Sequence, residues 1–312
     1  MKNRNILIVI LAFVSVYGLS ASEVATVWAR LYGRAQSLEQ KYEIMLNMVE
    51  QHDRDLSPVL SEALSKLILE ERNLTDQSER ALNAELERII IRELGSLKAV
   101  ESAPAVMTVA KEAKDNFLRG EALTALGKMG AKEYAPDIAL MLRNINSSIT
   151  PIQNKQEEET VVKGCIFALE RMKDPVGFEP VFFASIGRYS REIRLRAQDA
   201  LLVIADDPSE MLAEIIEKDS SPEVKYEALL AAKRSKASPE GKNGVAVSAL
   251  QASLLEADKD PIERIILRQM RIDALLLMRD SGVQSEENVQ LITQMISGWK
   301  KYRLYTEDEM LA

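Results

Sequence analysis

The chain contains 312 residues, of which 46% are hydrophobic, 28% are charged and only 5% are aromatic. This hydrophobic content excludes a wholly disordered chain, and the abundance of Ala, Leu, Ile and Glu is typical of a helical protein. The net charge of −8 argues against nucleic acid as a ligand, because binding a polyanion depends on Lys and Arg residues that neutralise phosphates.

The first residues have the pattern of a secretory signal peptide. Lys2 and Arg4 precede an apolar run from Ile6 to Leu19, and small residues follow it. That run has 14 residues, whereas a helix that spans a bilayer needs about 20. Residues 1–21 are therefore predicted to be cleaved, which places the mature chain in the bacterial periplasm or outside the cell. The alternative is an uncleaved anchor that keeps the chain on a membrane.

Residues 22–84 are predicted to form a helical N-terminal cap. Apolar residues share one helical face at Val24, Trp28, Leu31, Leu38, Tyr42 and Met45. Residues 57–71 have the pattern of a second helix, with Ser57 as its N-cap and Pro58 in its first turn. A row of stacked hairpins exposes its apolar ends unless atypical terminal units cover them.

The stretch EALTALGKMGAKEYAPDIALMLRN, at residues 121–144, predicts two short helices joined by a tight turn. Apolar residues recur every three or four positions on either side of Gly130. A glycine at this point can adopt the left-handed conformation that ends a helix, and Pro136 suits the first turn of the next helix. One such hairpin cannot bury all of its apolar surface, so copies of it must stack.

Residues 85–300 contain related copies of this hairpin. The pattern recurs 32 residues upstream with Lys98 in place of Gly130, and downstream copies follow at steps of 43, 32 and 31 residues and one longer step. The matched positions include Leu94 with Leu126, Gly95 with Gly127, Pro104 with Pro136, and Cys165 with Ala122 and Ala197. Inserted loops at residues 144–159 and 236–244, which are polar and rich in turn-forming residues, are predicted to account for the longer steps.

The motifs SSPEVKYEALLAA (220–232) and LRGEALTALGKMGAKEYAPDIALML (118–142) resemble the bacterial HEAT repeat, in particular the short kind also found in phycobilisome lyases. The resemblance implies an all-α fold, an α-solenoid of about five to six stacked HEAT-like hairpins with atypical terminal caps. The repeats are expected at residues 85–300. Residues 285–305 are expected to close the far end, and residues 301–312 to form a C-terminal tail.

Residues that carry chemistry in enzymes are sparse. The only histidine, His52, has no other histidine or cysteine near it in the sequence, so no metal site is predicted. The only cysteine, Cys165, takes a position that alanine fills in other copies, which indicates packing and not a reactive thiol. Acidic pairs such as Asp206 and Asp207 lie in turns beside helix starts, where solvent and the helix dipole explain them. No catalytic residue and no cofactor are predicted.

Two clusters remain as candidate protein-binding sites, because aromatic residues and Arg are typical anchors of protein interfaces. The first cluster is Trp299, Lys300, Lys301, Tyr302 and Arg303, and the second is Phe182, Phe183 and Tyr189. For Trp299, packing within the terminal cap is the alternative. Part of the second cluster must belong to the core, yet its rings cannot all face inward from one helix.

These observations favour an exported, noncatalytic scaffold that binds another protein or an envelope assembly through a concave or terminal surface. The second helix of each hairpin is expected to line the concave surface. One alternative is a HEAT-like enzyme of the bilin-lyase or DNA-glycosylase type, against which the export signal, the acidic charge and the missing catalytic set argue. The other is a structural component that an uncleaved N-terminus tethers to a membrane.

Overall fold

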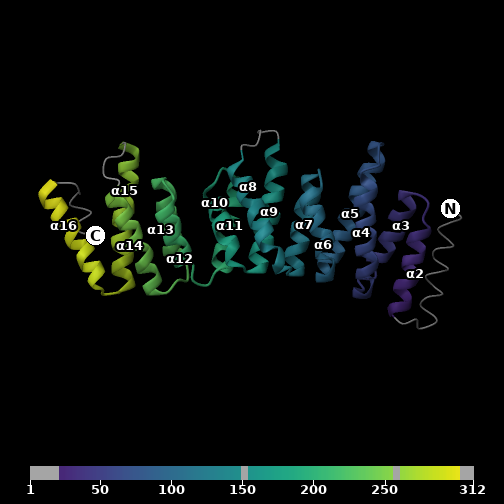
Figure 1. Ribbon diagram of the computed structural model, residues 1–312, viewed down its shortest axis with the longest axis horizontal. Helices are drawn as coiled ribbons and strands as arrows, with labels where there is room; N and C mark the ends of the chain where they lie inside the picture. The colour runs from purple at the N-terminus through teal and green to yellow at the C-terminus, as the bar shows by residue number, and fades with distance from the viewer. Residues whose placement is uncertain (1–20, 149–153, 256–260, 303–312) are drawn as a thin grey trace. The chain divides into compact units, whose positions relative to one another are not determined.

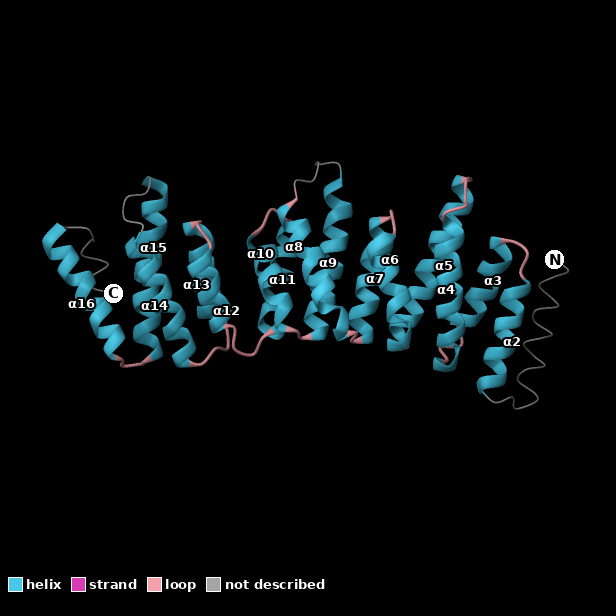
Figure 2. Ribbon diagram, viewed as in Figure 1, coloured by secondary structure: helices cyan, strands magenta, loops and turns pink. Residues whose placement is uncertain are grey.

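The computed structural model describes residues 21–148, 154–255 and 261–302, and the chain divides into two compact units, Met1–Met172 and Lys173–Ala312. The predicted signal segment, apart from its last residue Ala21, and the chain beyond Tyr302 lie outside the described residues. All regular secondary structure in the described part is helical, as Figure 2 shows. The predicted all-α fold of stacked helical hairpins is confirmed within each unit.

The first unit consists of helices that follow one another side by side in chain order (Figure 1). Their bounds are α2 Ala21–Arg34, α3 Leu38–Val49, α4 Ser57–Glu71, α5 Gln77–Ser96, α6 Ala103–Glu112, α7 Asn116–Met129, α8 Ala135–Ser147 and α9 Lys155–Met172. Each even-numbered helix packs against the helix that follows it, and the odd-numbered helices contact one another in sequence from α3 to α9. The packing partners of α7 therefore differ from the predicted one: α7 packs most extensively on α9 and also on α5 and α6, whereas the tight turn links it to α8.

A common turn connects α3 to α4, α5 to α6 and α7 to α8. A residue just beyond the first helix takes a left-handed conformation, with φ of 48° at His52, 52° at Lys98 and 72° at Gly130. One turn of 3₁₀ helix follows, and a proline stands in the first turn of the next helix. Gly130 ends α7 as predicted. Because α3 and α4 have the same turn, the geometry of the repeat begins within the segment that the sequence indicated as an atypical cap.

The predicted N-cap of α4 is wrong. The 3₁₀ turn Arg54–Leu56 runs directly into α4, so Leu56 takes the N-cap position and no side chain caps the helix. Ser57 is fully buried in the first turn, and its hydroxyl has no hydrogen-bond partner among the described residues. Pro58 lies in the first turn as predicted.

Glycines allow the odd-numbered helices of the first unit to approach closely. A Cβ added to Gly127 of α7 would lie 2.8 Å from Cα of Ala168 in α9, and one added to Gly164 of α9 would lie 2.8 Å from the carbonyl oxygen of Gly120 in α7. Gly95 of α5 approaches α7 in the same way. A side chain at any of these three positions would clash, so the backbones of α5, α7 and α9 approach closely there.

The second unit repeats the arrangement. After a 3₁₀ turn at Pro175–Gly177, its helices are α10 Phe178–Ile186, α11 Arg191–Ile204, α12 Ser209–Lys218, α13 Pro222–Arg234, α14 Pro239–Leu255, α15 Pro261–Ser281 and α16 Glu286–Tyr302. Helices α10, α12 and α14 each pack on the helix that follows them. In addition, α12 contacts α14, α13 contacts α15, and α14 contacts α16.

Both predicted insertion loops are partly helical. Helix α8 continues to Ser147 and α9 begins at Lys155, so both ends of the predicted loop 144–159 are helix. Helix α14 begins inside the predicted loop 236–244, where the hydroxyl of Ser238 accepts a hydrogen bond from the backbone N–H of Gly241 at 3.0 Å. Glycine and asparagine favoured a turn in the sequence, but packing on α12 holds this segment helical: a Cβ on Gly241 would lie 2.7 Å from Oγ of Ser209.

Candidate functional site

The structure places the second predicted cluster mostly inside the second unit. Phe182 and Tyr189 are buried, so they belong to the part of this cluster that the sequence assigned to the core, and as candidate binding residues they are corrected. The reason is helical spacing: Phe178, Val181 and Phe182 occupy the same buried side of α10. Only Phe183 is half-buried, and its ring packs edge-on against Phe182 with the ring centres 5.5 Å apart.

The first predicted cluster falls at the end of the described chain. Trp299, Lys300, Lys301 and Tyr302 belong to the last turns of α16, but their side chains lie outside the described residues, as does the whole of Arg303. Their role in binding stays a prediction.

Helix α16 carries two apolar stripes. Leu291 and Met295 are buried on the side that faces α14. On another side, Val289 is 65% exposed and Ile292 is 36% exposed, and Ile296 continues this stripe one turn further. The sequence predicted a terminal cap here, and a cap would have a polar outer face. The exposed stripe was missed, although its spacing of three and four residues is visible in the sequence.

Hydrogen bonds fix the start of α16 against the rest of the unit. The buried amides of Asn243 in α14 and Asn288 in α16 bond reciprocally, at 3.2 and 2.9 Å. The amide of Asn288 also donates to the carbonyl of Val283 at 3.0 Å, and its backbone N–H donates to the hydroxyl of Ser285 at 3.1 Å. These hydrogen bonds join the first turn of α16 to α14 and to the loop that precedes α16.

A cavity of about 710 Å³ lies between α15 and α16. Its lining is mainly apolar and includes Leu275 and Met278 from α15 and Val289, Ile292 and Ile296 from α16. Arg279, Gln284 and Glu286 are among its polar lining residues. A cavity of this size and composition suits several aliphatic or aromatic side chains, and it contains no paired acid and base for catalysis.

The position of α16 in the succession of helices explains this open cavity. Every even-numbered helix from α2 to α14 packs on the odd-numbered helix that follows it. Helix α16 has no such successor among the described residues. Its exposed stripe and the cavity are therefore the surface that a following helix would cover.

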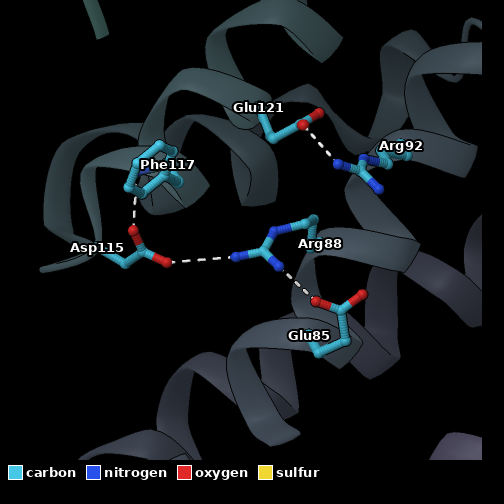
Figure 3. Close-up of polar contacts among 6 residues, drawn as sticks. All are labelled: Glu85, Arg88, Arg92, Asp115, Phe117 and Glu121. Carbon is cyan, nitrogen blue, oxygen red and sulfur yellow. Dashed lines mark hydrogen bonds and ion pairs between the residues drawn. The ribbon is translucent and has the colours of Figure 1, made fainter. Parts of the chain in front are cut away.

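Several charged side chains on α5 and at the start of α7 pair with one another. As Figure 3 shows, Arg88 of α5 bridges Glu85 and Asp115, the latter at 3.4 Å. Alongside, Arg92 donates to Glu121 of α7 at 2.6 Å, and this hydrogen bond lowers the pKa of the Glu121 carboxyl. These side chains join α5 to α7, so this face is a set of ion pairs between neighbouring helices and offers little free charge to a ligand.

The thiol of Cys165 is buried, and the imidazole of His52 has a carboxylate partner. Cys165 is fully buried, and burial raises the pKa of its thiol to about 12, so the predicted packing role is confirmed. His52 lies at the surface, with Nδ1 3.0 Å from a carboxylate oxygen of Glu93. Within the described residues, no group of three or more His, Cys, Asp or Glu side chains is placed to hold a metal ion, and no helix is long and apolar enough to cross a membrane.

No family model matches the chain, and no curated protein matches it significantly. Among solved structures, it is similar to the complex of CpcE and CpcF of phycocyanin lyase from Nostoc sp. PCC7120, with 14% sequence identity and a TM-score of 0.48. The match covers 82% of this chain and 94% of that chain.

Proposed function

We propose that this protein is a noncatalytic scaffold that binds an amphipathic helix of another protein in the cavity between α15 and α16. The observation that carries the proposal is the exposed stripe of Val289, Ile292 and Ile296, which borders an apolar cavity at the one even-numbered helix of the described chain without a following partner. A helix from a partner protein would take the place that α15 takes beside α14.

The residues that line the cavity indicate which residue types a partner helix would need. Aliphatic residues at positions i, i+3 or i+4, and i+7 would enter the cavity, as in other helix-in-groove complexes. Glu286 lines the cavity and Glu287 is exposed beside it, whereas the lining residue Arg279 pairs with Asp280 at 3.2 Å. Basic residues are therefore expected where the partner helix meets the start of α16. Such a complex would draw most of its affinity from a few apolar anchors.

Site-specific crosslinking in the producing cell tests the proposal. A photoreactive residue at position 289 should crosslink to one partner protein, and a matched residue at Ile265 of α15 should not, since Ile265 is 69% exposed but does not line the cavity. The helix of that partner, as a peptide, should then bind the purified chain. Val289→Asp or Ile292→Asp should weaken this binding at least about tenfold, and Ile265→Asp should leave it unchanged.

Other occupants of the cavity give different results. Crosslinks from position 289 to residues 303–312 of the same molecule would mean that the chain covers its own cavity. Crosslinks to a second copy, with a mass that doubles as concentration rises, would mean self-association. Either result, or equal loss of binding with the Ile265→Asp control, contradicts the proposal.

The proposal includes export, which the signal-like pattern of residues 1–21 supports. N-terminal sequencing of the protein purified from its native cell should give a start between Ala21 and Glu23. A start at Met1 would contradict export by cleavage and would favour the tethered or intracellular alternatives.

A further inference from the structure

A second cavity, of about 220 Å³, lies inside the first unit among the last turns of α4 and α6 and the middle of α5. Glu87 of α5 lines it, although this side chain is only 2% exposed. Its Oε1 accepts a hydrogen bond from Nδ2 of Asn83 at 2.8 Å. Asn83 is 1% exposed, and its own Oδ1 has no partner among the described residues. Oε2 of Glu87 accepts no hydrogen bond from the described residues, and Glu87 lines the cavity, whereas Asn83 lies behind it and does not.

The repeat places a cation where α5 has Glu87. The offset of 32 residues that aligns α5 with α7 brings Glu87 into register with Arg119. Arg119 donates through Nε to the carbonyl of Ala110 at 3.1 Å and through a terminal nitrogen to Oδ1 of Asn116 at 3.1 Å. Ala110 belongs to the last turn of α6, where carbonyl groups lack helical partners and carry partial negative charge. The guanidinium of Arg119 therefore stabilises the end of the neighbouring helix.

The surroundings of Glu87 also favour a cation. The final turns of both α4 and α6 border the cavity and direct their negative dipole ends toward this region. Burial first, and the charge of Glu71 second, raise the pKa of the Glu87 carboxyl to about 7, against the lowering effect of Asn83. A carboxylate in this position lacks the positive partner that burial requires.

None of the three cations that line the cavity forms an ion pair with Glu87 among the described residues, and Lys114 is exposed. Arg72 of α4 pairs with Glu112 of α6 at 3.3 Å. Arg80 of α5 donates through Nε to the carbonyl of Leu74 at 2.8 Å. The charged groups that line the cavity besides Glu87 are Glu71, Arg72, Arg80, Glu112 and Lys114.

We propose that this cavity binds a guanidinium group, which supplies to α5 the cation that Arg119 supplies to α7. The planar group donates to Oε2 of Glu87, and its positive charge lies at the ends of α4 and α6. Its source is either a small guanidino compound or an arginine side chain of a peptide. The site is separate from the α15–α16 cavity and does not depend on the function proposed for it.

Calorimetric titration of the full chain with ethylguanidinium at constant ionic strength tests the proposal. Saturable binding is expected at pH 8, with a dissociation constant on the order of millimolar for so small a ligand. Affinity should fall about tenfold between pH 8 and pH 6, because the ionised fraction of a carboxyl with a pKa of about 7 falls by about that factor. Ethylammonium, which lacks the planar set of donors, should bind at least about tenfold more weakly.

Substitutions of Glu87 distinguish binding in this cavity from nonspecific binding. Glu87→Gln keeps the acceptor for Asn83 but removes the charge, and it should abolish binding. Glu87→Arg should abolish binding and also raise the midpoint of thermal unfolding at pH 8, because it fills the cavity with the missing cation. Glu85→Gln is the matched control: this acid lies on the same helix but does not line the cavity, and it should bind as the parent chain does.

Titration with the blocked tripeptide acetyl-Gly-Arg-Gly-amide shows whether the natural guanidinium group comes from a peptide or from a small compound. Tighter binding of the tripeptide than of ethylguanidinium indicates an arginine side chain, and the reverse indicates a small compound. Absence of saturable binding of both probes at pH 8, equal binding to the Glu87→Gln variant, or equal affinity for ethylammonium would overturn the proposal.

Discussion

At the scale of single residues, the turn that links successive helices depends on one backbone angle. His52, Lys98 and Gly130 take the left-handed conformation at corresponding places in the first unit, and Lys173 takes it directly after α9, with φ of 52°. Only glycine adopts this conformation without steric cost, which for other residues is about 1–2 kcal/mol. In three of these four turns the left-handed residue is not glycine, so the backbone conformation there has a steric cost.

Lys98→Gly should stabilise the first unit. Removal of the left-handed strain outweighs the greater chain entropy of glycine in the unfolded state, so a gain of about 0.5–1 kcal/mol in the free energy of unfolding is expected. Gly130→Ala should lose about 1–2 kcal/mol, and entirely through the backbone, since nothing lies within 4 Å of a Cβ there. Urea denaturation measures both changes. Lys98→Ala, which keeps the strain, is the control, and a gain as large as that of Lys98→Gly would refute the explanation.

Single residues were predictable where the chemistry is local. Gly130 and Pro136 signal a helix end and a helix start by their own backbone preferences, and the structure has both. The burial of Phe182 and Tyr189 was not predictable in this way, because whether an aromatic ring faces a neighbour or solvent depends on which side of a short helix packs. Glu87 gave no signal in the sequence, since one acid among many is distinctive only once its burial is known.

At the scale of secondary structure elements, the reciprocal amide pair of Asn243 and Asn288 joins α14 to α16. Both side chains are buried, so each needs the other for its hydrogen bonds. The pair therefore holds the helix whose outer stripe borders the candidate binding cavity.

Replacing both members of this pair should cost less than the sum of the two single replacements. Asn243→Leu or Asn288→Leu leaves a buried amide without a partner, for a loss of about 1–3 kcal/mol each. The double variant should lose less than the sum by about 0.5–3 kcal/mol, because two apolar groups can face each other there. A double-mutant cycle by chemical denaturation gives the coupling, and strictly additive losses would show that the two amides act independently.

The existence of most helices was predictable, and their boundaries were less so. The apolar stripe of α7 follows from the spacing of its apolar residues, and the turn to α8 follows from Gly130 and Pro136. The start of α14 was taken for a loop because glycine and asparagine weaken the helical pattern, and only contact with α12 decides the outcome. The exposed stripe of α16 had the right period, but the sequence does not say which of two stripes faces the protein.

At the scale of the whole molecule, every extensive helix contact in the described part of the chain joins helices no more than two places apart in the helix order, as the sequence predicted for stacked hairpins. The division after Met172 was not predicted, because the repeat continues through it with the same left-handed residue, Lys173. The spacing of apolar residues in the sequence shows which residues face a neighbouring helix. The extent of each compact unit depends on the packing of specific side chains and on glycine contacts.

The backbone contacts of Gly120, Gly127 and Gly164 have a consequence for how the first unit opens. Repeat proteins commonly lose structure one module at a time, since each module adds its own increment of stability. Here α7 cannot loosen without exposing backbone that α9 shields, because the two backbones approach closely at Gly120, Gly127 and Gly164. Deuterium uptake by mass spectrometry should therefore find the amides of both helices exchanging as a single kinetic class, while those of α2 at the end exchange sooner; separate classes for α7 and α9 would contradict this.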